Sequence, residues 1–154
     1  AKRTIVALPG AGIGAEAAPA ACVAAVAKAR ELGVRINVAV VDAGGNLAAF
    51  LRMPGAFLHS IGIATDKAYT AASFGFPTGQ WAAALAGNEP LRQGLMQVPR
   101  LTMIGGGFPV SENGVRLGGV GVSGASEEQD ILCARAALAA LGLDTFGLDK
   151  EEQP

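Results

Sequence analysis

Two turn signatures constrain the fold of this chain more than any other feature of its sequence, because each joins runs of strand-forming residues. The first is the polar and glycine-rich stretch 42–46, which separates residues 34–41 from residues 47–51. The second is Asn113-Gly114, which is typical of two-residue hairpins and precedes the run 115–122. Hairpins pair their strands antiparallel, so the sequence predicts an antiparallel sheet.

The remaining elements follow from helical spacing of apolar residues and from glycine and proline breaks. Pro19 lies inside the first helical pattern, and we place the start of that helix near Ala18, where proline is tolerated in the first turn. Helices are predicted at about 14–32, 57–74 and 126–142, short helical turns at 80–86 and 90–96, and further strands at 101–104 and 108–111.

This order of helices and hairpins predicts an α+β fold in which helices cover an antiparallel sheet. The chain of 154 residues has the length of one domain, which we assign to residues 1–154. Aromatic residues make up only 5%, so Ala, Val, Ile and Leu must build the core. Small side chains bury little area each, and we expect self-association to add stability.

Charge and hydropathy exclude several classes of partner. Lys and Arg number 12 and Asp and Glu 13, so no basic surface is available for nucleic acid or an acidic membrane. The longest uncharged stretch, 68–88, is interrupted by Gly75, Pro77 and Gly79, which argues against a membrane span. The apolar run 5–8 is too short for a signal peptide, so we expect a cytoplasmic protein.

The cysteines and the histidine restrict metal chemistry. Cys22 and Cys133 each fall in a predicted helix and are interpreted as buried thiols. One histidine and two separated cysteines cannot form a Cys/His zinc site, so no structural metal is expected. A haem needs one axial ligand, which His59 could supply alone or with Met53 or Tyr69. Alternatively, His59 is a surface or helix-start histidine that coordinates no metal.

Two glycine-rich patterns imitate catalytic or nucleotide motifs. Residues 10–15 fit the loose form of a dinucleotide-binding loop, but the next strand enters a hairpin instead of a βαβ unit. Residues 121–125 imitate a nucleophile elbow around Ser123, although the only histidine lies upstream. We interpret the first as the entry to a helix and the second as a turn that caps the last helix.

Lys67 is the charged residue with the most open interpretation. It lies in the middle of a predicted helix among Ala64, Ala68 and Ala71, which offer no local partner. Desolvation there would lower its pKa and suit it to act as a base or to hold an anion. Alternatively, its aliphatic stem lies over apolar surface and its ammonium remains in water.

A set of short motifs spread along residues 17–142 resembles the haem-binding uptake protein and GlcG-like family, to which the C-terminal domain of some corrinoid adenosyltransferases is related. The motifs are VDAGGNL at 41–47, RMPGA at 52–56, KAYTAA at 67–72, PT at 77–78, GGGFP at 105–109, GVGVSG at 119–124, and the acidic residues Glu127, Glu128 and Asp130. The resemblance implies a profilin-like α/β/α sandwich with a five-stranded antiparallel sheet, assembled into homo-oligomers.

The resemblance also implies a pocket in which cations, backbone donors and a carboxylate converge. His59 would lie at its rim, although the first helix, where some haem-binding members carry their ligand, has no histidine. The residues expected to form the pocket are Arg52, Lys67, Gly105, Gly106, Gly107, Pro109, Glu128 and Asp130.

The leading functional prediction is an oligomeric small-ligand-binding protein, with haem or another tetrapyrrole as the ligand. The alternative is a cofactor-independent isomerase, hydratase or hydrolase acting on a small oxygenated catabolic metabolite. In that case Arg52 and Lys67 would hold the anion, and His59, Lys67 or Glu128 would move the proton. A third reading is an accessory subunit encoded in a catabolic operon.

Overall fold

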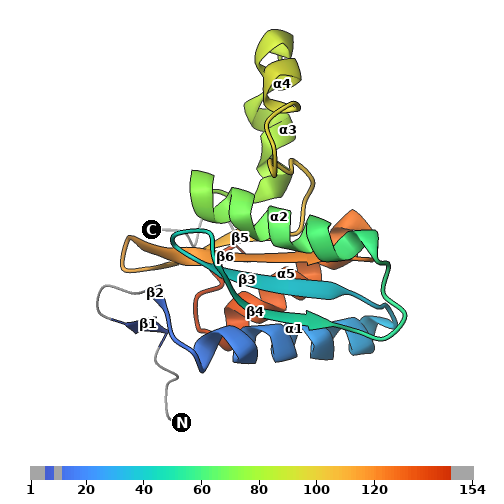
Figure 1. Cartoon of the computed structure of the whole chain (residues 1–154), viewed down its shortest axis with the longest axis vertical. Coiled ribbons are helices and arrows are strands. Elements are labelled where there is room, and N and C mark those ends of the chain that lie inside the picture. Colours follow the sequence, from blue (N-terminus) through green and yellow to red (C-terminus); the bar gives the residue numbers. More distant parts are fainter. Residues whose placement is uncertain (1–5, 9–11, 147–154) are drawn as a thin grey trace.

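The computed structural model describes residues 6–8 and 12–146, and it confirms an α+β fold (Figure 1). Its helices and strands alternate much as the sequence predicts. They are β1 (Ala7–Leu8), β2 (Gly12–Ile13), α1 (Ala17–Leu32), β3 (Asn37–Asp42), β4 (Leu47–Arg52), α2 (His59–Phe74), the 3₁₀ turn η1 (Thr78–Gln80), α3 (Trp81–Ala84), α4 (Glu89–Leu95), β5 (Gly107–Glu112), β6 (Val115–Ser123) and α5 (Glu127–Ala140).

The main sheet of the described residues has four strands in the order β4-β3-β6-β5, and every neighbouring pair is antiparallel. The expectation of five strands is wrong, because residues 101–104 do not form a strand. Their backbone groups bond to side chains instead: Thr102 N–H donates to Thr70 Oγ1 at 3.0 Å, and Thr78 Oγ1 donates to the Ile104 carbonyl at 2.6 Å. β1 and β2 form a separate antiparallel pair.

Both predicted hairpins are confirmed. In the first, Asp42 Oδ1 accepts hydrogen bonds from the N–H groups of Gly44 and Asn46, each at 2.9 Å. In the second, Asn113 and Gly114 have φ angles of 53° and 76°, the left-handed conformation that a tight hairpin turn requires. The turn residues therefore set the register of the strands that they join.

The first and last helices also begin close to where the sequence places them. α1 starts at Ala17, so Pro19 lies in its first turn. α5 starts after a complete capping box, in which Gln129 N–H donates to Ser126 Oγ at 3.1 Å and Ser126 N–H donates to Gln129 Oε1 at 3.2 Å. The position of Pro19 in α1 and the capping box of α5 both agree with the local sequence signals.

The glycine-rich segment before α1 does not form a nucleotide-binding loop in its described part. Gly10 and Ala11 lie outside the described residues, and Gly12 and Ile13 belong to β2. The next strand of the main sheet, β3, pairs antiparallel with both of its neighbours. The parallel crossover that a dinucleotide site needs is therefore not formed here.

Helices cover both faces of the sheet, with α1 and α5 on one side and α2 on the other (Figure 1). Alternate residues of β3 divide between these faces. Val38 and Val40 pack with the alanines of α1 and with α5, whereas Ala39 and Val41 pack against α2. Cys22 and Cys133 are free thiols in the larger core, and burial raises their pKa to about 12 and about 11 respectively.

Contact between α2 and β6 is unusually close, because glycine occupies the facing positions of the strand. A Cβ on Gly119 would overlap the carbonyl oxygen of Ala68, and a Cβ on Gly121 would overlap that of Ala64. The backbone of α2 therefore lies directly on the backbone of β6. This contact brings Lys67, in the middle of α2, to the end of the strand.

Residues 78–104, which we call the arm, project from the sheet beyond α2 (Figure 1). The arm contains η1, α3 and α4, and α4 has no buried residue. Its returning segment is attached to α2 by Arg100, whose Nε pairs with Asp66 Oδ1 at 3.1 Å and whose carbonyl accepts from Thr70 Oγ1 at 3.0 Å. The base of the arm is thus fixed, while its tip extends away from the core.

Candidate functional site

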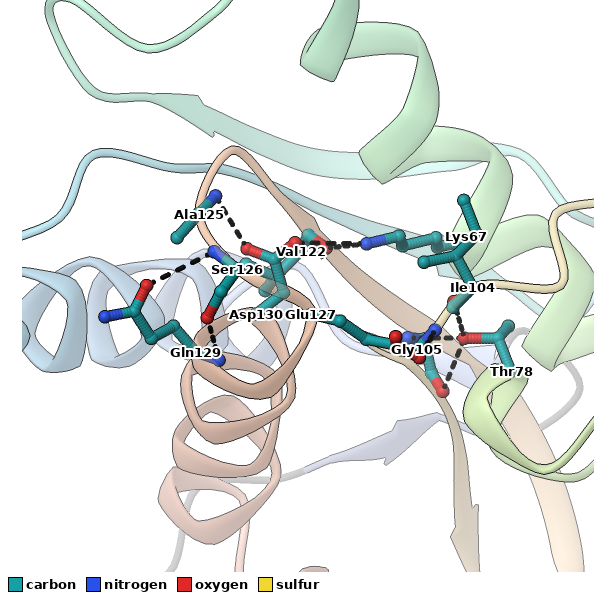
Figure 2. A network of polar contacts seen from close by, with 11 residues as sticks. Lys67, Thr78, Ile104, Gly105, Val122, Ala125, Ser126, Glu127, Gln129 and Asp130 are labelled. Atoms are coloured by element: carbon teal, nitrogen blue, oxygen red, sulfur yellow. Dashed lines mark hydrogen bonds and ion pairs between the residues drawn. The ribbon is translucent and has the colours of Figure 1, made fainter.

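Lys67 is the centre of a buried polar network. Its side chain is 2% exposed, and Nζ donates to the Val122 carbonyl at 2.8 Å and forms an ion pair with Asp130 Oδ2 at 3.2 Å (Figure 2). The interpretation with a solvated ammonium is therefore wrong. The helical periodicity placed Lys67 on α2 but could not identify partners that lie far away in the sequence.

The ion pair joins helices that lie on opposite faces of the sheet. Lys67 comes from α2 and Asp130 from α5, and they meet beside Val122 near the end of β6, where β5 begins. Gly106 makes room for the contact, since a Cβ there would lie 2.9 Å from Lys67 Nζ and 2.7 Å from the Val122 carbonyl oxygen. With φ at 121°, Gly106 also adopts a backbone conformation that favours glycine.

Electrostatics in this network balance desolvation against attraction. Burial lowers the pKa of Lys67 and raises that of Asp130, and each residue opposes the shift of the other. Asp130 Oδ1 also accepts a hydrogen bond from Ala125 N–H at 3.0 Å. Since both charges are costly to bury, the pair depends on these contacts, and neither partner tolerates the loss of the other alone.

The glycine loop beside the ion pair is fixed at both ends by polar side chains. Gly105 N–H donates to Glu127 Oε1 at 2.9 Å, and Gly107 N–H donates to Thr78 Oγ1 at 2.9 Å (Figure 2). Thr78 is fully buried, whereas Glu127 is exposed. Neither residue was predicted to have a role at the site, although both lie in the motifs Pro77-Thr78 and Glu127-Glu128 that the sequence displays.

A pocket of about 350 Å³ opens next to this loop. Along α5, Glu127, Ile131 and Arg135 follow one another at four-residue spacing and line one wall. The complete lining is Pro77, Gly79, Gln80, Gly106, Phe108, Glu127, Ile131, Arg135 and Phe146. We call it the α5 pocket.

The structure brings together only part of the predicted site. Lys67, Gly106, Gly107 and Asp130 meet, and Gly105 is tied to the same loop through Glu127.

The other predicted residues lie elsewhere. Pro109 pairs with Gly119 within the sheet, and Glu128 is exposed in the first turn of α5. Arg52 lies at the end of β4, where its guanidinium donates to the Ala56 carbonyl at 2.9 Å. The roles assigned to these residues stay predictions.

His59 occupies a different surface, at the exposed start of α2. The two residues before it, Phe57 and Leu58, are each 69% exposed. One turn further on, Gly62 has open space where a Cβ would stand, and Ile63 is 37% exposed. We call these five residues the His59 surface. It is apolar apart from one imidazole.

Two kinds of feature are absent from the residues that the structure describes. Within residues 6–8 and 12–146, no cluster of three or more His, Cys, Asp and Glu side chains is arranged to hold a metal ion. Among the helices of the same part of the chain, none combines the length and apolar character needed to cross a bilayer.

Comparisons with known proteins agree with the fold. The family model of the haem degrading protein HbpS-like family matches residues 13–139. The corrinoid adenosyltransferase PduO of Citrobacter freundii is 39% identical over an alignment of 128 residues, and the match covers 79% of this chain and 37% of PduO. The chain thus spans little more than a third of that relative.

Solved structures of related proteins superpose over most of the chain. HbpS has a TM-score of 0.79 at 38% identity, covering 92% of this chain and 99% of HbpS. The PduOC complex with heme has a TM-score of 0.75 at 32% identity, covering 87% of this chain and 98% of PduOC. On the extent of these matches, the chain belongs to the HbpS-like family of haem degrading proteins.

Proposed function

We propose that this protein binds haem at the His59 surface, with His59 as the axial ligand. Support comes from membership of the HbpS-like family, from the similar PduOC structure, which is a complex with heme, and from the composition of this surface. The observation that carries the proposal is an exposed imidazole surrounded by exposed apolar side chains at the start of α2. When bound, haem would supply its iron as the site of redox or ligand chemistry.

The residues of the His59 surface fit a flat apolar ligand. Phe57 and Leu58 expose large apolar side chains that such a ligand would cover. Gly62 lies one turn after His59 and has no side chain to obstruct a ring approaching the imidazole. The arrangement therefore combines one metal ligand with a cleared apolar face.

A cation suited to a haem propionate lies at the same corner of the molecule. Arg52 pairs in register with Asn37, and Asn37 Nδ2 donates to the Phe57 carbonyl at 3.1 Å. This bond connects the first residue of β3, which pairs with Arg52, to the segment that leads into His59. We propose Arg52 as the propionate partner, because guanidinium groups bind carboxylates through paired hydrogen bonds.

Titration with hemin, followed through the Soret band, tests this function. We expect a saturable band in the wild-type protein and its loss in His59→Ala, because the axial bond requires the imidazole. Gln97→Ala, an exposed change on the arm, serves as the control and should leave the titration unchanged. An unsaturable change in absorbance, or a band that persists in His59→Ala, would contradict ligation by His59.

We also propose that the protein is a homo-oligomer and that the arm carries the contact with a second copy. Exposed apolar side chains on the arm include Leu91 at 46% and Met96 at 57%. The same arm has a cavity of about 460 Å³ whose lining includes Trp81, Leu85 and Met103. A two-fold contact uses the same surface on both copies, so that surface must offer protruding side chains and a cavity that receives them. The arm has both.

Light scattering coupled to size exclusion tests the oligomer. We expect the wild-type protein to elute as a dimer or larger species and Met96→Glu to shift toward the monomer, because a buried unpaired carboxylate opposes association. The neighbouring exposed change Gln97→Glu adds the same charge outside the cavity lining and should have little effect. A monomeric wild-type protein would refute the assignment.

No contact among the described residues joins the side chains that the enzymatic alternative requires. Lys67 Nζ contacts Val122 and Asp130, and no described hydrogen bond or ion pair joins it to Arg52, His59 or Glu128. A cofactor-independent reaction by this set of residues therefore stays a hypothesis.

A further inference from the structure

We propose that the α5 pocket binds a small linear zwitterion, a compound with an amine at one end and a carboxylate at the other. This site lies apart from the His59 surface, and the proposal does not depend on haem. Its chemistry follows from three residues on one face of α5, namely Glu127, Ile131 and Arg135.

Spacing along the helix separates the two charges of the pocket. Glu127 and Arg135 are eight residues apart, which corresponds to about 12 Å of rise along the helix axis. Ile131 lies midway between them on the same face. The α5 wall of the pocket therefore presents an anion, an apolar side chain and a cation, in that order along the helix axis.

The carboxylate end is held in place by the glycine loop. Glu127 Oε1 accepts a hydrogen bond from Gly105 N–H at 2.9 Å, which fixes the side chain against the glycine loop (Figure 2). An ionised carboxylate has acceptor capacity for several hydrogen bonds, so this single bond leaves capacity for a ligand. An ammonium group is the ligand chemistry that such an oriented carboxylate favours.

The cationic end is oriented in a similar way. Arg135 Nε pairs with Asp144 Oδ2 at 3.3 Å, and its side chain remains 32% exposed. Because a guanidinium carries five N–H donors, the contact through Nε leaves its terminal amino groups with donors for a carboxylate. A ligand carboxylate is therefore the matching partner at this end.

Besides the two charged residues, the lining has three large apolar side chains and the amide of Gln80. Phe108 and Phe146 lie with their ring centroids 5.0 Å apart, and both contribute to the lining together with Ile131. A methylene chain fits this surface better than a second polar group does, because a buried polar group without a partner is costly. The lining thus selects a short aliphatic compound with unlike charges at its ends.

Isothermal titration calorimetry with three probes of equal carbon-chain length tests the proposal. The probes are δ-aminovalerate, glutarate and cadaverine, which carry one charge of each sign, two carboxylates and two amines. We expect saturable binding of δ-aminovalerate that is tighter than binding of the other two. Glu127→Gln and Arg135→Gln should each weaken it by about tenfold or more, since each removes a hydrogen bond between charged groups.

Glu31→Gln is the matched control, because it makes the same change at an exposed glutamate that pairs with Lys28 at the surface and does not line the pocket. It should leave the affinity unchanged. Thermal unfolding of each variant checks that the pocket is folded, and Arg135→Gln provides an independent test if Glu127→Gln disturbs the glycine loop. The proposal is overturned if δ-aminovalerate does not bind or if glutarate or cadaverine binds more tightly. It is also overturned if neither Glu127→Gln nor Arg135→Gln changes the affinity for δ-aminovalerate.

Discussion

Replacing Lys67 with methionine is expected to lower the free energy of unfolding at neutral pH by about 3–5 kcal/mol, the cost of leaving one partner of a buried ion pair uncompensated. Methionine fills a similar volume, so the loss reports on charge more than on packing. Lys28→Met is the matched control, because Lys28 pairs with Glu31 at the surface, where a salt bridge contributes about 0–1 kcal/mol. Urea denaturation of both variants measures the difference.

The loss of unfolding free energy caused by Lys67→Met should depend on pH in a defined direction. Burial already raises the pKa of Asp130 above its ordinary value of 3.8, and removing Lys67 takes away the charge that opposes this rise. A carboxyl group whose pKa is raised by folding stabilises the fold below the unfolded pKa, and that stability is lost as the pH rises through the folded pKa. The free energy of unfolding of the variant should therefore approach that of the wild type at acidic pH and drop below it as the pH rises toward 7.

A double variant separates charge from other effects. Lys67→Met with Asp130→Asn leaves no uncompensated charge, so it should be more stable at neutral pH than Lys67→Met alone. Equal stability of the two variants, or a loss from Lys67→Met no larger than that from Lys28→Met, would contradict a structural role for the ion pair.

Gly121→Val is expected to destabilise the fold by about 3 kcal/mol or more, at or beyond the upper part of the range for overpacked cores. Its side chain would overlap the backbone of α2 at Ala64, and a Cβ would also lie 2.5 Å from the Ala68 nitrogen. The backbone atoms of α2 cannot move to relieve this overlap as a flexible side chain could. Thermal unfolding followed by circular dichroism measures the loss.

The control is Gly62→Ala, on the exposed face of the same helix, where an added Cβ meets nothing within 4 Å. Alanine should stabilise α2 there by about 0.5–1 kcal/mol, since glycine is unfavourable inside a helix. If Gly121→Val unfolds no more easily than the wild type, the close contact between α2 and β6 is incorrect.

Local signals in the sequence predicted those parts of the fold whose cause is local. The turns at Asp42 and Asn113-Gly114 and the capping box at Ser126 depend on neighbouring residues, and all are confirmed. The expected strand at 101–104 is wrong because its backbone groups bond to Thr70 and Thr78, which lie 32 and 26 residues away. Such distant side-chain partners leave no periodic trace in the sequence.

The candidate site shows the same division between local and distant causes. The family resemblance implied a pocket that includes Lys67, the glycine loop and Asp130, and in the structure these residues are in contact, whereas Arg52 and Glu128 lie elsewhere. The sequence left open whether Lys67 is desolvated or keeps its ammonium in water, because its partner Asp130 lies 63 residues away on the opposite face of the sheet. Burial of a charged side chain is decided by tertiary packing, which spacing alone does not reveal.

The edge strand β5 limits how copies of this chain can associate. Among the strands that the structure describes, β5 pairs with β6 alone, and Pro109 lies within it. Proline has no backbone N–H, and its presence in an edge strand is one of the ways in which proteins avoid pairing with the sheet of another molecule. Assembly through β5 as a continuous intermolecular ladder is therefore disfavoured, which protects the protein from growing into fibres by sheet extension.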